Sequence, residues 1–175
     1  MNFFTSDTHF GHYLPALKRP FIGYEMDELM VKNWNDSVKS GDDVWFLGDF
    51  CLHTPESVMK ILFSRLNGNK HLLKGNHDQN NKVTKLPWGS VHDVHMFKMP
   101  DSYNLNASIP GIWLSHYPHR SWPQSFHGSL HLHGHSHGHL PPYVNSLDVG
   151  VDCHNFKPLS LDEVLVLIPR GELKS

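Results

Sequence analysis

Short apolar runs alternate with longer amphipathic segments in the first half of the chain. The apolar runs have the length of buried strands and predict strands at 3–5, 44–47 and 71–73. The segments between them space their apolar side chains as on one helical face, and they predict helices at 26–38 and 55–66. Gly41 is a stop signal after the first helix, and Pro55 suits the start of the second.

In the second half of the chain, short apolar runs follow one another without long amphipathic segments between them. Its apolar runs predict strands near 91–97, 111–115, 129–133, 146–151 and 163–168. Strands that alternate with helices at the front and are followed by further strands favour an α/β sandwich of two packed sheets with outer helices. A chain of 175 residues without an internal repeat or a Pro/Gly-rich linker fits a single domain over residues 1–175.

Composition narrows the class of protein. A hydrophobic fraction of 39% and a charged fraction of 18% are typical of an ordinary globular core. The formal charge of −2 gives no strong nucleic-acid signal. No apolar stretch approaches the about 20 residues that span a bilayer, and the first residues do not resemble a signal peptide. We therefore expect a cytoplasmic enzyme without a membrane partner, and the oligomeric state stays open.

Histidine is the unusual residue type, since 16 histidines stand against 15 lysines and arginines. They cluster at 9–12, 71–77, 92–95, 116–119 and 127–139. Neutral imidazoles beside aspartates suit a centre for borderline metal ions such as Zn, Mn, Fe or Ni.

The expected strands repeatedly end at polar side chains, namely Asp7 and His9, Asp49, Asn76 and His77, His116, and His135 and His137. In open α/β sheets the site lies beyond the carboxyl ends of the strands. Asp-x-His and His-x-His each place two ligands on one side of an extended segment. Glycines at 48, 75 and 134 permit close backbone approach just before the ligating residues. Each motif alone also fits a plain turn or a core histidine, but five of them at strand ends favour a metal site.

These motifs, Asp-x-His, Gly-Asp, Gly-Asn-His-Asp, His and Gly-His-x-His, span residues 7–137, and in this order they resemble the calcineurin-like metallophosphoesterases. The opening segment 3–12 and the short length of the chain are similar to those of the small family members that are found in bacteria and phages. The resemblance implies a four-layer α-β-β-α sandwich and hydrolysis of phosphate esters by a metal-activated hydroxide.

The resemblance also implies two divalent metal ions. The first is expected on Asp7, His9, Asp49 and His137. The second is expected on Asp49, Asn76, His116 and His135, with Asp49 bridging. Manganese is the expected ion, with iron, zinc, nickel or cobalt as alternatives. Two cations about 3.5–4 Å apart can clamp the entering and leaving oxygens of a phosphate, and a bound water reaches a pKa near about 7.

The resemblance assigns His77 to contact with the phosphate and to protonation or polarisation of the leaving oxygen. The titration range of histidine suits general acid catalysis. His12 and Arg120 are expected to bind substrate. Phosphoprotein phosphatases carry an aspartate three residues after Gly-Asp, where this chain has Leu52, so protein phosphatase activity is disfavoured. Asp78 is the alternative orienting group for His77, although we favour it as the cap of a helix starting near Gln79.

The remaining polar residues receive weaker expectations. Arg19, His53 and His119 are further candidates for the pocket wall, whereas Asp148 and Asp152 are expected to shape a strand and turn. Most other histidines are expected to be solvated, including His92, His95, His127, His131, His133 and His139.

The sequence thus favours a hydrolase for small phosphodiesters, because no cap domain is present and lysine and arginine are few. A phosphomonoesterase for small molecules is the alternative. An inactive scaffold of the same fold is a weaker one, because no motif residue is missing. A DNA repair nuclease would need additional binding regions, and a simple metal buffer would not need Asp49 and Asn76.

Overall fold

A computed structural model describes residues 1–12, 18–78, 82–103 and 109–171 of the chain, which form an α/β fold with two mixed sheets. The first sheet has the order β4-β3-β2-β1-β9. Its strands are β1 (Asn2–Thr5), β2 (Asp43–Phe46), β3 (Asn69–Leu73), β4 (Ser90–His92) and β9 (Leu159–Ser160). The first four are parallel and β9 runs antiparallel to β1.

The second sheet has the order β5-β6-β7-β8. Its strands are β5 (Val94–Phe97), β6 (Ile112–Ser115), β7 (Leu130–His133) and β8 (Ser146–Asp148). Here β5 is antiparallel to β6, and the other pairs are parallel. A parallel bridge between Ser6 and Gly150 joins the two sheets just beyond β1 and β8. The carboxyl ends of β1 and β8 are thereby held close together.

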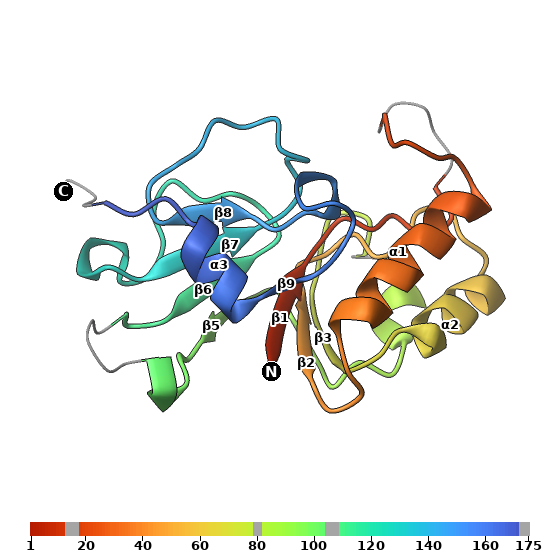
Figure 1. Ribbon diagram of the computed structural model, residues 1–175, viewed down its shortest axis with the longest axis horizontal. Coiled ribbons are helices and arrows are strands. Elements are labelled where there is room, and N and C mark those ends of the chain that lie inside the picture. Colours follow the sequence, from red (N-terminus) through yellow and green to blue (C-terminus); the bar gives the residue numbers. More distant parts are fainter. Residues whose placement is uncertain (13–17, 79–81, 104–108, 172–175) are drawn as a thin grey trace.

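Two helices cover the outer face of the first sheet (Figure 1), namely α1 (Tyr24–Ser37) and α2 (Glu56–Arg65). Trp34 of α1 and Phe63 of α2 pack there against Val44 and Phe46. These side chains alternate along β2 with Trp45, which faces the other way, toward the second sheet. The two helices expected from the sequence are confirmed, because their apolar faces have this sheet to cover.

A second core lies between the sheets. It contains Phe4 and Leu73 from the first sheet and Leu114 and Leu132 from the second, all fully buried. Figure 1 shows the second sheet on the face of the first that α1 and α2 leave free. The expected pair of packed sheets is therefore present.

The strand expected at 163–168 is wrong, because this segment is helix α3 (Leu161–Leu167). Ser160 and Glu163 form a reciprocal capping box that satisfies free backbone N–H groups at the start of the helix. Leu161 and Val164, three residues apart, both face the core between the sheets. The apolar run alone was compatible with either element, and the cap distinguishes them.

The expected strand at 91–97 is two strands in different sheets. β4 ends at His92, Asp93 turns the chain, and β5 begins at Val94. Short 3-10 segments complete the described elements: η2 (Lys82–Lys85), η3 (Asp101–Tyr103), η4 (Ser125–His127) and η5 (Val151–Cys153). The helix start expected near Gln79 lies outside the described residues. Within the described ranges, no helix combines the length and apolar character needed to cross a bilayer.

Candidate metal centre

Backbone hydrogen bonds tie the loops at the carboxyl ends of the strands to one another. The N–H of Asp7 donates to the Gly48 carbonyl at 3.0 Å, and the N–H of His9 donates to the Asp49 carbonyl at 3.0 Å. In the second sheet the N–H of Gly134 donates to the His116 carbonyl at 3.0 Å. The motif loops are therefore fixed in register before any side chain is considered.

The backbone is unusual at most of the expected ligands. Positive φ angles occur at Asp7 (59°), His9 (46°), Asp49 (62°), His135 (67°) and His137 (47°). Residues other than glycine rarely adopt this left-handed region, and each instance costs free energy. Strain gathered at one edge of a fold is characteristic of sites whose side chains must point to a common centre.

The glycines before the ligands are required by close packing. A Cβ atom at Gly75 would overlap the carboxylate of Asp49, and one at Gly134 would overlap Ser6 Oγ and the Asp7 carboxylate. Gly48 has a φ of +95° and packs against Gly75 and the ring of His116. The expectation of close backbone approach at these three glycines is confirmed.

Asp49 lies at the centre of the side-chain cluster. Its Oδ2 atom is 3.7 Å from Nε2 of His9, 3.6 Å from Nε2 of His116 and 3.9 Å from Nε2 of His77. Its other oxygen, Oδ1, accepts a hydrogen bond from the backbone N–H of His77 at 3.0 Å. The Asp49 carboxylate thus reaches residues from three other loops, which belong to both sheets.

Two groups of side chains have donor atoms within 4.8 Å of one another, as one metal ion requires. Asp7, His9 and His137 form the first group, and Asp7, Asp49 and His116 form the second. Asp7 Oδ1 and both ring nitrogens of His9 are buried and have no hydrogen-bond partner among the described residues. Buried polar atoms without partners are costly, and a cation would satisfy Asp7 Oδ1 and the one ring nitrogen of His9 that carries a lone pair.

The electrostatics of the cluster also favour a cation. Burial raises the pKa of Asp7 to about 7, and burial raises the pKa of Asp49 as well. Burial lowers the pKa of His9 to about 2 and that of His116 to about 4. His9 and His116 are therefore neutral and keep a lone pair for a ligand, whereas the hydrogen bond to Asp152 raises the pKa of His137. A cation would stabilise the charged form of the buried Asp7 and Asp49 carboxylates.

His116 is oriented by its backbone partner. Its Nδ1 donates to the Leu47 carbonyl at 2.7 Å, which leaves Nε2 free of a proton. Nε2 lies 3.0 Å from Oδ1 of Asn76. Asn76 and His116 thus present an amide oxygen and an imidazole nitrogen side by side, next to Asp49.

His137 is oriented by a chain of buried ionic contacts. Its Nδ1 lies 2.8 Å from Oδ2 of Asp152. Arg19 contacts the same carboxylate at 2.8 Å and 3.0 Å, and it also donates to the backbone carbonyls of Asp7 and Thr8. Burial raises the pKa of Asp152, but the bonds from His137 and Arg19 outweigh it and hold the pKa at about 2. The sequence did not predict that Asp152 and Arg19 orient His137, because nothing in the motifs connects them to that histidine.

His135 is positioned through its backbone. Its N–H donates to Oδ2 of Asp7 at 2.9 Å, so one oxygen of Asp7 is used and the other stays free. The His135 ring lies 5.1 Å from that of His116 and 4.7 Å from that of Tyr117. The structure therefore brings His135 to the side of the cluster that holds Asn76 and His116.

Asp78 joins two of the motif loops, while the helix that it was expected to cap lies outside the described residues. Its Oδ2 accepts the N–H groups of Asp49 (2.7 Å) and Gly75 (2.9 Å), and Oδ1 accepts the N–H of Phe50. The fully buried Asp78 carboxylate therefore fixes the Asp49 loop against the Gly75 loop.

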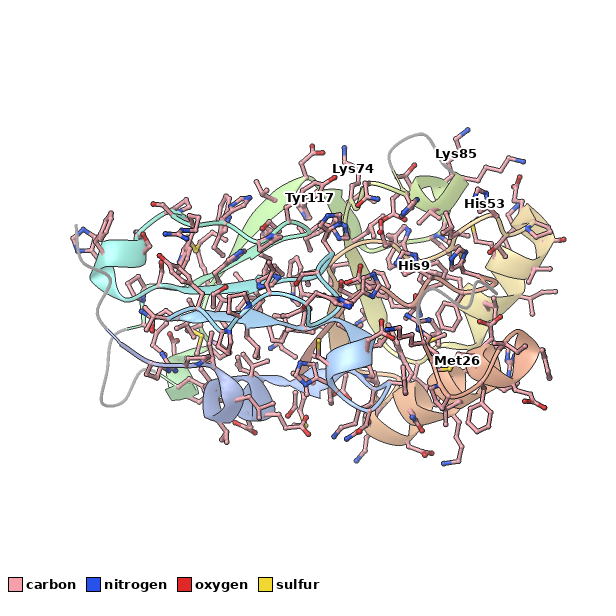
Figure 2. All side chains as sticks on the ribbon, turned by 90° about the horizontal axis from the view of Figure 1, so that it is seen from above. His9, Met26, His53, Lys74, Lys85 and Tyr117 are labelled. Atoms are coloured by element: carbon pink, nitrogen blue, oxygen red, sulfur yellow. The ribbon has the colours of Figure 1, made fainter. Side chains whose placement is uncertain are left out.

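His77 and His12 lie at the exposed side of the cluster. The ring of His77 is 5.5 Å from that of His9, and its side chain is 39% exposed. The ring of His12 is 6.0 Å from His9 and 6.5 Å from His53. Figure 2, seen from above, shows His9 inside the molecule and His53 further out, on the side of α2. These imidazoles are placed to meet a ligand that approaches from solvent.

Full-length similarity connects the chain to an archaeal protein. It is 33% identical to "Uncharacterized protein MJ1445" of Methanocaldococcus jannaschii over 180 residues, which cover 96% of this chain and 91% of that protein. The chain belongs to the family of that archaeal protein. It is also 28% identical to "Gene 66 protein" of Mycobacterium phage D29, over 94% of each chain. No family model matches the sequence.

A solved structure has the same fold as this chain. It is the crystal structure of "the Protein of Unknown Function AQ665 from Aquifex aeolicus", with a TM-score of 0.72 and 23% identity. The match covers 96% of this chain and 99% of the other. At this identity the likeness shows a common fold and nothing further about chemistry.

Arg120, the other expected substrate-binding residue, is exposed, and its guanidinium lies 5.3 Å from the ring centre of Tyr143. It lines a cavity beside β8 whose lining contains none of the seven expected ligands. His131 and His133 are buried, so the expectation that they are solvated is wrong. They occupy positions in β7 that alternate with the core leucines, and the loops after β6 cover them.

Proposed function

We propose that this protein is a metal-dependent phosphoesterase with two divalent cations at the cluster around Asp49. The observation that carries the proposal is a set of buried atoms without hydrogen-bond partners among the described residues, Asp7 Oδ1 and the ring nitrogens of His9, in a cluster where burial raises the pKa of both Asp7 and Asp49. A protein that bound no cation there would bear the full desolvation cost of these groups.

The donor atoms suit borderline divalent ions. Imidazole nitrogens with carboxylate and amide oxygens fit manganese, iron, zinc, nickel or cobalt. Asp7, His9, Asp49 and His137 would hold one ion, and Asp49, Asn76, His116 and His135 the other. Asp49 Oδ2 lies 3.7 Å from Nε2 of His9 and 3.6 Å from Nε2 of His116, so this carboxylate would be within reach of both ions. Asp7 is the residue that the two groups of close donor atoms share, and its carboxylate would also lie near both. When bound, such a pair of ions neutralises phosphate charge and lowers the pKa of bound water.

The residues at the exposed side would handle the substrate. His77 carries an imidazole next to the cluster but belongs to neither group of close donor atoms. A proton held at its Nε2 would be available to the leaving oxygen of the ester, which is general acid work. The bond from the His77 N–H to Asp49 fixes the backbone that carries this ring. His12 and His53 would contact the remaining oxygens of the phosphate from the same side.

The preferred substrate class is a small phosphodiester, because the cluster is surrounded by imidazoles and few fixed cations. A monoester would bring one more negative charge and is the alternative substrate. If the chain is a calcineurin-like metallophosphoesterase, its sheets and helices would form a four-layer α-β-β-α sandwich. The layer of α1 and α2, followed by two sheets, supports this arrangement.

Metal analysis and an ester screen test the proposal. We expect close to two transition metal ions per chain and hydrolysis of chromogenic and nucleotide diesters with Mn, Ni, Co, Zn or Mg supplied in turn. A chelator should abolish the activity. Asp49→Asn should reduce binding at both sites, because it removes the shared charge, whereas Asp93→Asn, an exposed aspartate, should leave it unchanged.

Two results would contradict the assignment in different ways. If the native chain binds no metal under saturating Mn, the metal centre itself is wrong. If it binds two ions and hydrolyses none of the esters, the fold serves as a metal-binding scaffold and the enzymatic proposal is wrong.

A further inference from the structure

A hollow borders the loop that carries His135 and His137. It has a volume of about 510 Å³ and lies around the edge strand β8. Its walls are the loop after β6, the loop between β7 and β8, and the end of α3. The volume is within the range of about 300–1,000 Å³ that is typical of small-molecule sites. Ser136, between two expected metal ligands, is part of the lining.

The walls of this cavity are mostly apolar. Leucines and prolines dominate the lining, including Leu140, Leu147, Leu167, Pro141 and Pro169. Leu140 is 51% exposed and Leu167 is 49% exposed, so both present apolar surface to solvent. A concave apolar surface of this kind is stabilised when a ligand removes it from water. Tyr143 adds an aromatic ring, against which a second flat ring can stack.

The lining contains one arginine, Arg120, and one carboxylate, Asp148. Arg19 and Arg65 pair with carboxylates, but Arg120 has no carboxylate within ion-pair distance in the described part of the chain. It is held over the ring of Tyr143 at 5.3 Å. The carboxylate in the lining, Asp148, already accepts bonds from Ser136 Oγ and from two backbone N–H groups. An occupant would therefore gain from a negative charge placed beside Arg120.

From these observations we propose that the cavity binds a small aromatic anion. Its ring would lie between Tyr143 and the leucine and proline side chains, with its negative charge beside Arg120. The ring could belong to the organic group of a phosphoester substrate or to a separate molecule that binds beside the metal centre. In both cases the occupant would touch the two loops that carry His116, His135 and His137.

Anilinonaphthalene sulfonate, a fluorescent aromatic anion, is a suitable probe for the full chain loaded with manganese. We expect saturable binding of one dye per chain. Arg120→Gln should weaken the binding about tenfold, and Leu140→Trp should weaken it by filling the entrance. Arg65→Gln is the matched control, since Arg65 pairs with Glu28 on the helical face, and it should leave dye binding unchanged. Equal thermal unfolding temperatures would show that all variants are folded.

Dye binding that is absent, or that is the same in Arg120→Gln and Leu140→Trp as in the native chain, would overturn the proposal. Enzyme kinetics distinguish a ring that belongs to the substrate from a ring that belongs to a separate molecule. This part of the test rests on the proposed function. If the dye raises KM for naphthyl phosphate esters without changing kcat, the cavity holds the organic group of the substrate. If it changes kcat instead, the cavity holds a separate ligand. Because the dye titration needs no turnover, its result stands even if no ester is hydrolysed.

Discussion

Nδ1 of His137 lies 2.8 Å from Oδ2 of Asp152, a residue that Arg19 holds in place from the other side. This pair has the form in which a carboxylate orients a metal-binding imidazole. Such partners raise the basicity of the ring and fix the nitrogen that faces the ion. Asp152 therefore acts on the proposed centre without touching the ion, through His137.

The first prediction follows from this contact. Asp152→Asn should lower metal affinity about 10- to 100-fold, the usual effect of losing such a partner. The loss should concern one of the two ions, since His137 belongs to one group of close donor atoms. Isothermal titration calorimetry with the metal measures the affinity and the number of ions bound. Asp93→Asn is the control, and unchanged affinity in folded Asp152→Asn would remove the orienting role.

The second prediction concerns the close packing of the loops. Gly75→Ala should destabilise the fold by about 1–3 kcal/mol, the usual cost of overpacking, and should weaken metal binding, because the new Cβ would overlap the Asp49 carboxylate. Gly41→Ala is the matched control, since no atom lies within 4 Å of a Cβ built there. Denaturant unfolding compares the two variants. Equal stability of both would show that the Asp49 loop adapts freely.

The third prediction separates His77 from the ligands. His77→Ala should keep near-normal metal content, while turnover falls by about 10²–10⁴, the usual contribution of general acid catalysis. The loss should be greatest for alkyl or ribose leaving groups and smaller for nitrophenyl esters, whose leaving group needs no proton. His139→Ala, an exposed histidine, is the control. Loss of a full equivalent of metal, or an equal loss for all leaving groups, would refute this role.

The fourth prediction concerns stability in acid. His131 is fully buried, donates from Nδ1 to the Trp113 carbonyl and accepts at Nε2 from the His119 N–H. Only the neutral ring can make both bonds, and burial lowers the pKa of His131 to about 3. In the unfolded chain the pKa is about 6.5. Between these values the unfolded state binds one more proton, so stability rises with pH and is lost as pH falls.

His131→Gln keeps a donor and an acceptor but cannot take up this proton. The slope of unfolding free energy against pH, measured between about pH 3 and 6.5, should therefore fall by about 1.4 kcal/mol per pH unit. His127→Gln, at an exposed position, should leave the slope as it is in the native chain. An unchanged slope in His131→Gln would mean that the ring is protonated in the folded state.

The sequence by itself indicated the two helices on the first sheet, most of the strands and the residues that meet at their ends. This was possible because apolar periodicity is local and because parallel strands present their carboxyl ends at one edge. The resemblance to the metallophosphoesterases, and with it the activity, stays a prediction. The metal ligands could be proposed from short motifs, since each motif comes directly after a strand of its own.

Only the tertiary structure decided the features that depend on distant pairs. Asp152 and Arg19 are 133 residues apart, and no local pattern links them to His137. The burial of His131 depends on the loops that cover β7, and the cavity beside β8 depends on three segments that meet in space. Helix α3 forms because a capping box starts it and because Leu161 and Val164 pack together into the core between the sheets. Periodicity reports the face of an element, but the partner of that face is set by the packing of the whole chain.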